Sequence, residues 1–141
     1  MKKIIDKLFL IKEIRSKEGV LHFKRYRLLS TPWFNIYIHK IYKADRDLHL
    51  HDHPWNYFNI IIKGAYIEQT IENGVIKNNS MLCLCTSRRK ATQCHKIAHM
   101  VTPCVTTLFI TGKTFRTWGY NVNGNWIDNE TYRKLKNDKK L

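Results

Sequence analysis

The stretch that decides the fold is HLHDHPWNYFNIIIKG, residues 49–64. In an extended chain alternate side chains point to opposite faces, so His49, His51 and His53 would share one face of a strand. The neutral imidazole nitrogen is the commonest protein ligand for zinc, iron, copper and nickel. The spacing therefore makes these histidines candidate ligands of one metal ion. The alternative is a solvated polar strand face, against which the apolar run before Gly64 argues.

Length and charge bound the class of protein. The chain has 141 residues, 43% of them hydrophobic, which fits one domain with a real core. It carries 25 Lys and Arg against 11 acids, a formal charge of +14, which favours anionic partners such as phosphates, nucleotides or nucleic acid. Part of this excess lies near the two ends of the chain, so solvated basic termini are the alternative explanation.

Cysteine content and hydropathy indicate the compartment. The chain contains four cysteines, Cys83, Cys85, Cys94 and Cys104. They are too few for a disulfide scaffold in a chain that can build a core, and they form no Cys-x2-Cys pair for a thiolate zinc site, so we expect reduced thiols. The N-terminus has no apolar run of signal length, and no segment approaches the roughly 18 apolar residues of a membrane span. We expect a soluble cytoplasmic protein with no membrane partner.

Turn signals divide the remaining chain into short strands. An amphipathic pattern predicts a short helix from about Ile4 to before Gly19, and a terminal helix is expected from Asn129 onward. Asn73-Gly74 predicts a hairpin, and residues 87–93 are expected to be a polar connection. Strands are predicted over residues 20–29, 35–43, 49–53, 65–72, 81–85, 105–111 and 115–120. Two more are expected in the apolar run that ends at Gly64 and in the return strand of the hairpin, which starts at residue 75. Eight or more short strands predict an antiparallel sandwich or barrel.

Two sequence blocks resemble the metal-site motifs of the cupin superfamily. They are the His-x-His block with its Ile-rich strand and glycine turn, and a separate histidine roughly thirty residues beyond that glycine. More narrowly, residues 49–68, His95 and residues 107–120 are similar to small single-domain cupins of bacterial and phage genomes, of an HxHDHPW type. The resemblance covers about residues 34–126. It implies an all-β, cupin-like double-stranded β-helix, or jelly-roll barrel, with short N- and C-terminal helical segments. The single domain would span residues 1–141, with a core at about residues 20–127.

The resemblance also implies a set of metal ligands. His51 and His53 match the histidine pair of the first cupin motif, with Tyr57 where its glutamate would stand and Gly64 as its closing glycine. His95 matches the histidine of the second motif. The expected cofactor is a divalent transition metal, namely iron, zinc, manganese or nickel.

Other side chains remain alternatives as ligands. A shifted register would make His49 and His51 the pair, and His99 falls where the second motif usually has asparagine. Without the motif's acid, three histidines would leave the ion its full charge and open positions for water or substrate. Glu68 could instead reach in from the next strand and complete the set.

Basic residues beside these blocks are candidates for substrate binding. Arginine pairs bidentately with phosphate or carboxylate, so we expect Arg116 and one of Arg88 or Arg89 to face a small anionic substrate. Tyr57 could donate a hydrogen bond to it. The alternatives are a solvated loop for the Arg88 run and stacking on an aromatic ring for Arg116.

Three classes of function follow. The first is a metal-dependent enzyme of the oxygenase, including dioxygenase, isomerase or hydrolase type. The second is a non-catalytic cupin module that binds or sequesters a nucleotide or other anionic metabolite. The third is a nucleic-acid-binding cupin, supported by the basic and aromatic residues 23–27 and the lysine-rich tail. Because cupin barrels often pair through their outer sheets, a homodimer is a further expectation.

Overall fold

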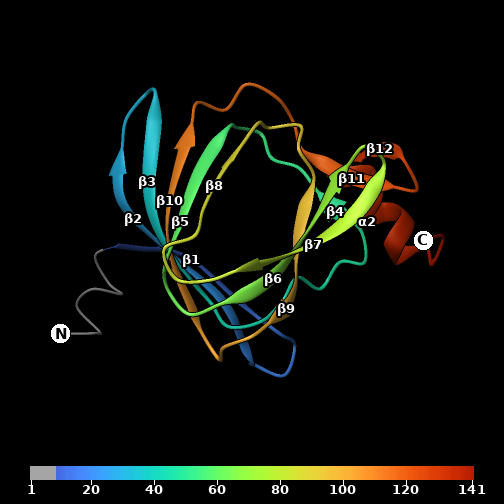
Figure 1. Ribbon diagram of the computed structural model, residues 1–141. Coiled ribbons are helices and arrows are strands. Elements are labelled where there is room, and N and C mark those ends of the chain that lie inside the picture. Colours follow the sequence, from blue (N-terminus) through green and yellow to red (C-terminus); the bar gives the residue numbers. More distant parts are fainter. Residues whose placement is uncertain (1–8) are drawn as a thin grey trace.

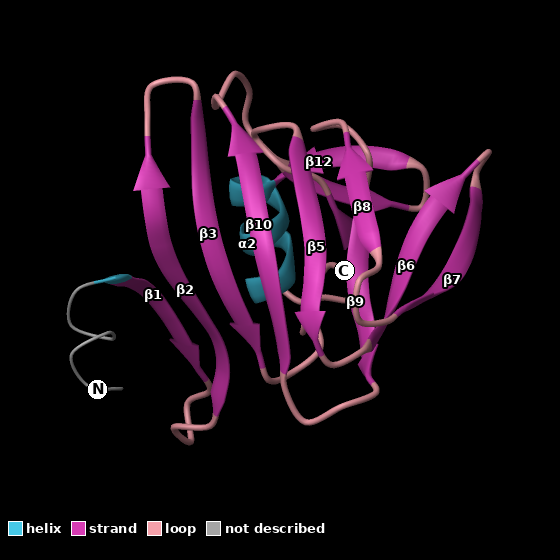
Figure 2. Cartoon of the chain, turned by 60° about the vertical axis from the view of Figure 1, so that its left-hand side comes forward, coloured by secondary structure: helices cyan, strands magenta, loops and turns pink. Residues whose placement is uncertain are grey.

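The computed structural model describes residues 9–141 and contains two antiparallel sheets that curl over one another (Figures 1 and 2). In spatial order the first sheet holds β1 (Leu10–Arg15), β2 (Leu21–Ser30), β3 (Phe34–Ile41), β10 (Val105–Gly112), β5 (Tyr57–Lys63) and β8 (Thr86–Arg89). The second holds β12 (Asn125–Asp128), β11 (Gly119–Val122), β4 (Leu50–His51), β9 (His95–Met100), β6 (Tyr66–Glu72) and β7 (Val75–Met81). Helix α2 (Asn129–Asn137) follows. This is the predicted all-β jelly-roll architecture with a C-terminal helix.

Side chains alternate between the interior and the surface along the central strands. In β10 every second residue from Val105 to Thr111 is buried, and β6 buries Tyr66, Glu68 and Thr70 in the same way. Because the side chains of a strand repeat with a period of two, one face of each sheet lines the interior. Several of these inward positions are polar, which is unusual for a core and marks the region of the candidate site.

The interior divides into an apolar part and a polar part. The apolar cluster consists of buried residues from five strands, namely Ile41, Ile61, Tyr66, Met81 and Val105. The next inward positions along β3, β5 and β6 are instead polar and buried, namely His39, Asn59 and Glu68. The same strands therefore contribute apolar side chains to the core at one level of the barrel and buried polar side chains at the next.

Helix α2 packs beside β11 and β12 (Figure 1). It begins after Asp128, whose carboxylate accepts hydrogen bonds from the backbone N–H groups of Glu130 and Thr131, both at 3.1 Å. Such an N-cap satisfies donors that the first helical turn leaves free. Tyr132, the buried residue of the helix, stacks on Tyr120 of β11 with ring centroids 3.7 Å apart. Among residues 9–141 no helix is both long enough and apolar enough to cross a membrane.

The Asn-Gly turn was predicted correctly. Asn73 and Gly74 have φ angles of 51° and 76°, and they connect β6 to β7. Two consecutive positive φ values are typical of the tight hairpin turns whose twist matches that of paired strands. Asn123 and Gly124 adopt the same conformation between β11 and β12.

The predicted N-terminal helix is wrong over residues 10–15, although Phe9 before them is helical. Residues 4–8 lie outside the described part, but Leu10–Arg15 form strand β1, which pairs antiparallel with β2. A short amphipathic pattern suits either a helix or a strand, and here the backbone hydrogen bonds offered by β2 override local propensity.

The strand predicted over residues 81–85 is also wrong beyond its first residue. After Met81 the chain turns, with Leu84 at φ 68° and a hydrogen bond from the Cys85 N–H to the Leu82 carbonyl at 2.9 Å. Cys83, expected in a buried strand, is exposed, although all four cysteines are free as predicted. The next strand, β8, lies in the segment predicted as a connection. As an edge strand it tolerates polar residues, so its sequence lacks the apolar signal of a strand.

Candidate metal centre

The candidate metal centre lies where the histidine strand meets β9. Strand β4 has only two residues, and within it His51 pairs with His95 of β9 on one side and Tyr120 of β11 on the other. Residues directly opposite each other in a sheet bring their side chains within contact. His53 follows His51 by two residues, and Pro54 then lacks the N–H that would continue the pairing. The pairing of His51 with His95, and the two-residue spacing of His51 and His53, together bring the three imidazoles to one place.

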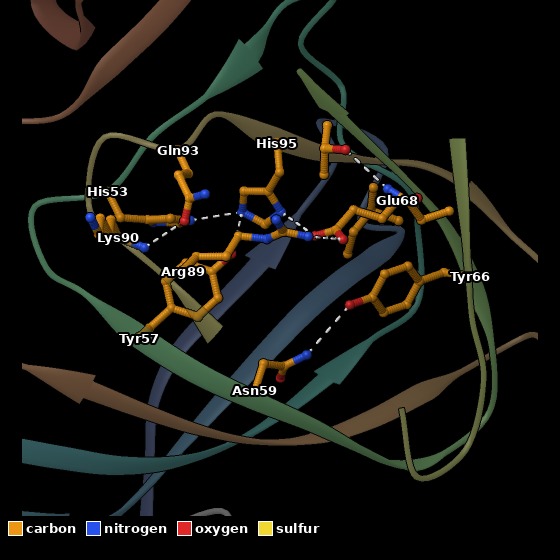
Figure 3. Close-up of polar contacts among 12 residues, drawn as sticks. His53, Tyr57, Asn59, Tyr66, Glu68, Arg89, Lys90, Gln93 and His95 are labelled. Carbon is orange, nitrogen blue, oxygen red and sulfur yellow. Dashed lines mark hydrogen bonds and ion pairs between the residues drawn. The ribbon is translucent and has the colours of Figure 1, made fainter. Parts of the chain in front are cut away.

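The three imidazoles form a cluster of metal-ligand geometry. One ring nitrogen each from His51, His53 and His95 lies within 4.8 Å of the others. Nε2 of His53 and Nε2 of His95 are 2.8 Å apart, and Figure 3 shows His95 between His53 and Glu68. A spacing of this size suits nitrogens that point at one ion about 2.0–2.1 Å from each.

The other two candidate histidines lie elsewhere. Nδ1 of His49 is 3.0 Å from the Tyr132 hydroxyl, because residue 49 precedes the short strand and its ring turns toward helix α2. His99 is exposed and pairs with Ile67 at the far end of β9. Neither belongs to the ligand cluster.

Glu68 contacts the cluster from behind. Its Oε1 is 2.7 Å from Nδ1 of His95, and its Oε2 accepts a hydrogen bond from the Arg89 guanidinium. Burial alone would raise the pKa of Glu68, but its contacts with His95 and Arg89 outweigh that effect and lower it. The ionised carboxylate therefore places the His95 proton on Nδ1 and leaves Nε2 with a free lone pair facing the other histidines. This carboxylate–histidine arrangement is the one that commonly orients metal-bound imidazoles.

Burial holds two of these histidine rings, His51 and His53, in the neutral form that a metal requires. Burial, and then the electrostatic interaction with His95, lowers the pKa of His51 to about 4. Burial, followed by the neighbouring histidines, lowers the pKa of His53 well below its ordinary value. Both rings are thus unprotonated at neutral pH, and no proton has to leave them before a metal binds. The donor set fits a divalent transition metal.

Tyr57 projects into the same space. Its hydroxyl is 3.2 Å from Nε2 of His95, and its ring stacks on Phe109 at 4.7 Å between centroids. Burial, followed by the negative charge of Glu68, raises the pKa of Tyr57 well above its ordinary value, so the hydroxyl stays protonated at neutral pH. A hydrogen-bond donor thus stands where the cupin resemblance expects a glutamate.

Arg116 is engaged by a buried acid behind the histidines. Its NH1 donates to Asp52 Oδ2 at 2.6 Å and to the His53 carbonyl at 3.1 Å. Asp52 is 1% exposed and also accepts from Gly119 N at 2.7 Å and Trp126 Nε1 at 2.9 Å. This network, whose acid the sequence analysis did not single out, fixes the backbone of His53. In this arrangement Arg116 supports the site and does not line the cavity that holds the histidines.

Arg88 and Arg89 point in opposite directions because they are neighbours on one strand. Arg89 pairs in register with Tyr57 and bonds Glu68 inside the barrel, whereas Arg88 is exposed and pairs with Phe58 on the outer side. A second cavity, of about 530 Å³, is lined by Arg88, Arg89 and Lys90 among others. Arg89 thus reaches the candidate site through Glu68.

The histidine cluster opens into a cavity of about 360 Å³. Cations line it, namely Lys12, Arg25, Lys43 and Arg46. From the sequence, Arg25 stood out only as part of the basic stretch 23–27, and the other three were not candidates for binding. Along β2 that stretch is split between faces, since Lys24 is buried and forms an ion pair with Glu13.

Solved structures of low sequence identity share this architecture. Hydroxypropylphosphonic acid epoxidase from S. wedmorenis matches 71% of this chain over 54% of its own length, at 12% identity and a TM-score of 0.55. A sugar phosphate isomerase of the cupin superfamily from Silicibacter pomeroyi matches 70% over 64% of its own length, at 16% identity and a TM-score of 0.55. The chain has the cupin fold.

The likeness to these cupins concerns the fold. The iron(II) form of hydroxypropylphosphonic acid epoxidase (HppE) in complex with substrate matches 76% of the chain at 13% identity and a TM-score of 0.58. The chain spans little more than half the length of the HppE structures that it matches. No protein-family model and no curated protein matches the sequence.

Proposed function

We propose that this cupin is a metal-dependent enzyme acting on a small anionic substrate. The observation that carries the proposal is the convergence of His51, His53 and His95 at a cavity lined by cationic side chains. Among the structural neighbours, iron(II)-bound and cobalt(II)-bound forms of HppE and a sugar phosphate isomerase support this choice over a purely structural barrel.

The three histidines would hold a divalent transition metal, namely iron, zinc, manganese or nickel. When bound, such an ion supplies Lewis acidity and, if it is iron, redox chemistry. Glu68 and Arg89 hold the His95 ring in one orientation and keep its proton on Nδ1. Tyr57 keeps a protonated hydroxyl in the cavity, where it can donate a hydrogen bond to an oxygen of the substrate.

The cavity restricts the size and charge of the substrate. Its volume of about 360 Å³ lies at the lower end of the range for small-molecule sites. Its walls carry Lys12, Arg25, Lys43 and Arg46, so an anion of metabolite size is the ligand that fits. A nucleic-acid strand would need a continuous positive groove with stacking platforms.

Metal analysis tests the proposal directly. Protein purified without an affinity tag is expected to contain about one equivalent of iron, zinc, manganese or nickel by elemental mass spectrometry, and His51→Ala and His95→Ala are expected to lose it. His99→Ala is the matched control, because His99 lies on the same strand as His95 but outside the cluster. Absence of metal after reconstitution with iron(II) or zinc would contradict the proposal.

A second measurement separates an enzyme from a sequestering module. Small molecules that copurify with the metal-loaded chain are identified by mass spectrometry before and after incubation. An enzyme is expected to convert its ligand, and His95→Ala is expected to abolish the conversion. Recovery of unaltered ligand from both proteins would favour a non-catalytic cupin that binds an anionic metabolite.

A further inference from the structure

Arg25 lies on β2 and lines the cavity, where neighbouring side chains hold its guanidinium in place. Its Nε donates to Nε2 of His39 at 2.9 Å, and its guanidinium carbon lies 5.1 Å from the Tyr37 ring centroid and 5.6 Å from that of Phe23. Burial, and then the charges of Arg25 and Lys12, keeps the pKa of His39 well below its ordinary value. The neutral imidazole can therefore accept this hydrogen bond. Within residues 9–141 this bond from Nε is the hydrogen bond that fixes the side chain, and the two terminal nitrogens remain for a ligand.

No carboxylate within residues 9–141 forms an ion pair with Arg25. A partly buried arginine usually has an acidic partner, because desolvating an unpaired charge costs free energy. Desolvation is indeed strong enough here to lower the pKa of Arg25. An unpaired cation held on a cavity wall is the arrangement expected of an anion-binding residue.

The acids of the same cavity are already engaged. Asp47 pairs with Lys136, and Glu68 pairs with Arg89. Asp45 accepts the backbone N–H of Ile97 at 2.7 Å. Among the described residues, Asp45 alone of these acids keeps an unpaired charge, so Lys12, Lys43 and Arg46 outnumber it and leave the cavity positive, and this surplus favours an anion with two negative charges over one with a single charge.

A wall of aromatic rings connects Arg25 to the histidine cluster. The His39 ring, which holds Arg25, lies 4.6 Å from the Phe109 ring. Phe109 in turn lies 4.7 Å from the Tyr57 ring and 6.5 Å from that of His53. One small molecule lying along this wall would reach both the guanidinium and the histidines.

We propose that Arg25 binds a phosphate or phosphonate group of the substrate, with Lys12 beside it at the cavity wall. The guanidinium fork matches two oxygens of such a group, and His39 sets the direction of the fork. This inference rests on the proposed function for the other end of the ligand, which would lie at the histidine cluster. It assigns the substrate to small phosphorylated or phosphonate compounds.

The test measures binding of methylphosphonate to the full chain by 31P NMR line broadening, with and without zinc. We expect saturable binding to the wild type and an increase in Kd of about tenfold or more in Arg25→Gln. Arg27→Gln is the matched control, because Arg27 lies on the same strand, is exposed, and lines neither cavity described above. Acetate, which carries a single charge, is measured by its displacement of methylphosphonate and is expected to bind about tenfold more weakly.

The outcomes separate the two proposals. Equal Kd values for Arg25→Gln and the wild type, no binding to the wild type, or equal affinity for acetate would each overturn the assignment of Arg25. If Arg25→Gln does not fold by circular dichroism, Arg25→Lys replaces it, and a Kd equal to that of the wild type overturns the assignment, because lysine keeps the charge but loses the fork. Zinc content is measured separately. A wild type that lacks zinc but binds methylphosphonate through Arg25 would contradict the metal centre alone.

Discussion

The Glu68 carboxylate lies 2.7 Å from Nδ1 of His95 and carries Arg89 on its other oxygen. It is 1% exposed, so its charge acts on His95 with little screening by water. At the scale of single residues this contact decides which nitrogen of His95 can bind an ion. A carboxylate that touches no metal would thus influence metal affinity through one proton.

The first prediction concerns that contact. Glu68→Gln keeps the shape of the side chain but removes its charge, and the Kd for zinc is expected to rise about 10- to 100-fold. Competition with a chromophoric chelator measures this Kd. Glu72→Gln is the control, because Glu72 lies on the same strand, exposed, and pairs with Lys77. An unchanged zinc affinity in Glu68→Gln would show that the carboxylate has no orienting role.

At the scale of elements, Asp52 joins segments that are distant in sequence. Its two oxygens accept hydrogen bonds from Arg116, from the β11 backbone at Gly119 and from Trp126 of β12. Arg116 also bonds the His53 carbonyl at 3.1 Å. The histidine segment is therefore fastened to β11 and β12 from the side away from the cavity.

The second prediction concerns this junction. Asp52→Asn leaves the Arg116 guanidinium without its buried partner and is expected to lower the free energy of unfolding by about 3 kcal/mol. Urea denaturation of the metal-free chain measures the loss. Asp138→Asn, at the exposed end of α2, is expected to change stability by less than about 0.5 kcal/mol. Equal stability of the two variants would mean that the network adds little.

The third prediction concerns the turn after the Ile-rich strand. Gly64 has φ +88°, and a Cβ there would lie 2.5 Å from the Cys104 carbonyl oxygen, whereas Gly74, at φ +76°, has open space around it. Gly74→Ala is expected to cost about 1–2 kcal/mol for its left-handed backbone alone. Gly64→Ala has to displace the backbone as well, so its loss in urea denaturation should be clearly larger. Similar losses would indicate that residues 102–105 yield easily.

At the scale of the whole molecule, the barrel buries neutral histidines. His39, His51 and His53 all have pKa values lowered chiefly by burial, that of His51 to about 4. In the unfolded chain each would have a pKa of about 6.5. Unfolding below that pH therefore takes up protons that the folded chain does not bind, and stability must fall as the pH drops from about 6.5 toward 4.

The fourth prediction follows from this proton uptake. Each histidine contributes up to about 1.4 kcal/mol per pH unit in that window, so the metal-free chain is expected to lose about 4 kcal/mol between about pH 7 and pH 5.5. Urea denaturation at several pH values measures the slope. The double variant His51→Gln, His53→Gln should retain only a minor part of it, and His99→Gln, at an exposed position, should retain it all. A flat profile would mean that the buried rings protonate within the fold.

Sequence patterns predicted the parts of the fold that depend on local chemistry. Asn73-Gly74 favours a tight turn because both residues accept a positive φ, and the alternating residues 105–111 favour a strand that is half buried. Strand β8 and the turn at residues 82–85 were missed because their conformation depends on pairing with β5 at a sheet edge. Strand β1 was mistaken for a helix for the same reason, since its partner β2 decides its conformation.

Alternation along a strand and tight turns predicted an antiparallel barrel and a shared face for His51 and His53, because both follow from neighbouring residues, whereas His95 followed only from the resemblance to the second cupin motif. Only the tertiary structure decided what surrounds them. Register between strands distant in sequence places Glu68 behind His95, Asp52 beneath Arg116 and Arg25 beside His39. Such contacts depend on which strands pair and in which register, and no local pattern encodes the partner of a charged side chain across the barrel.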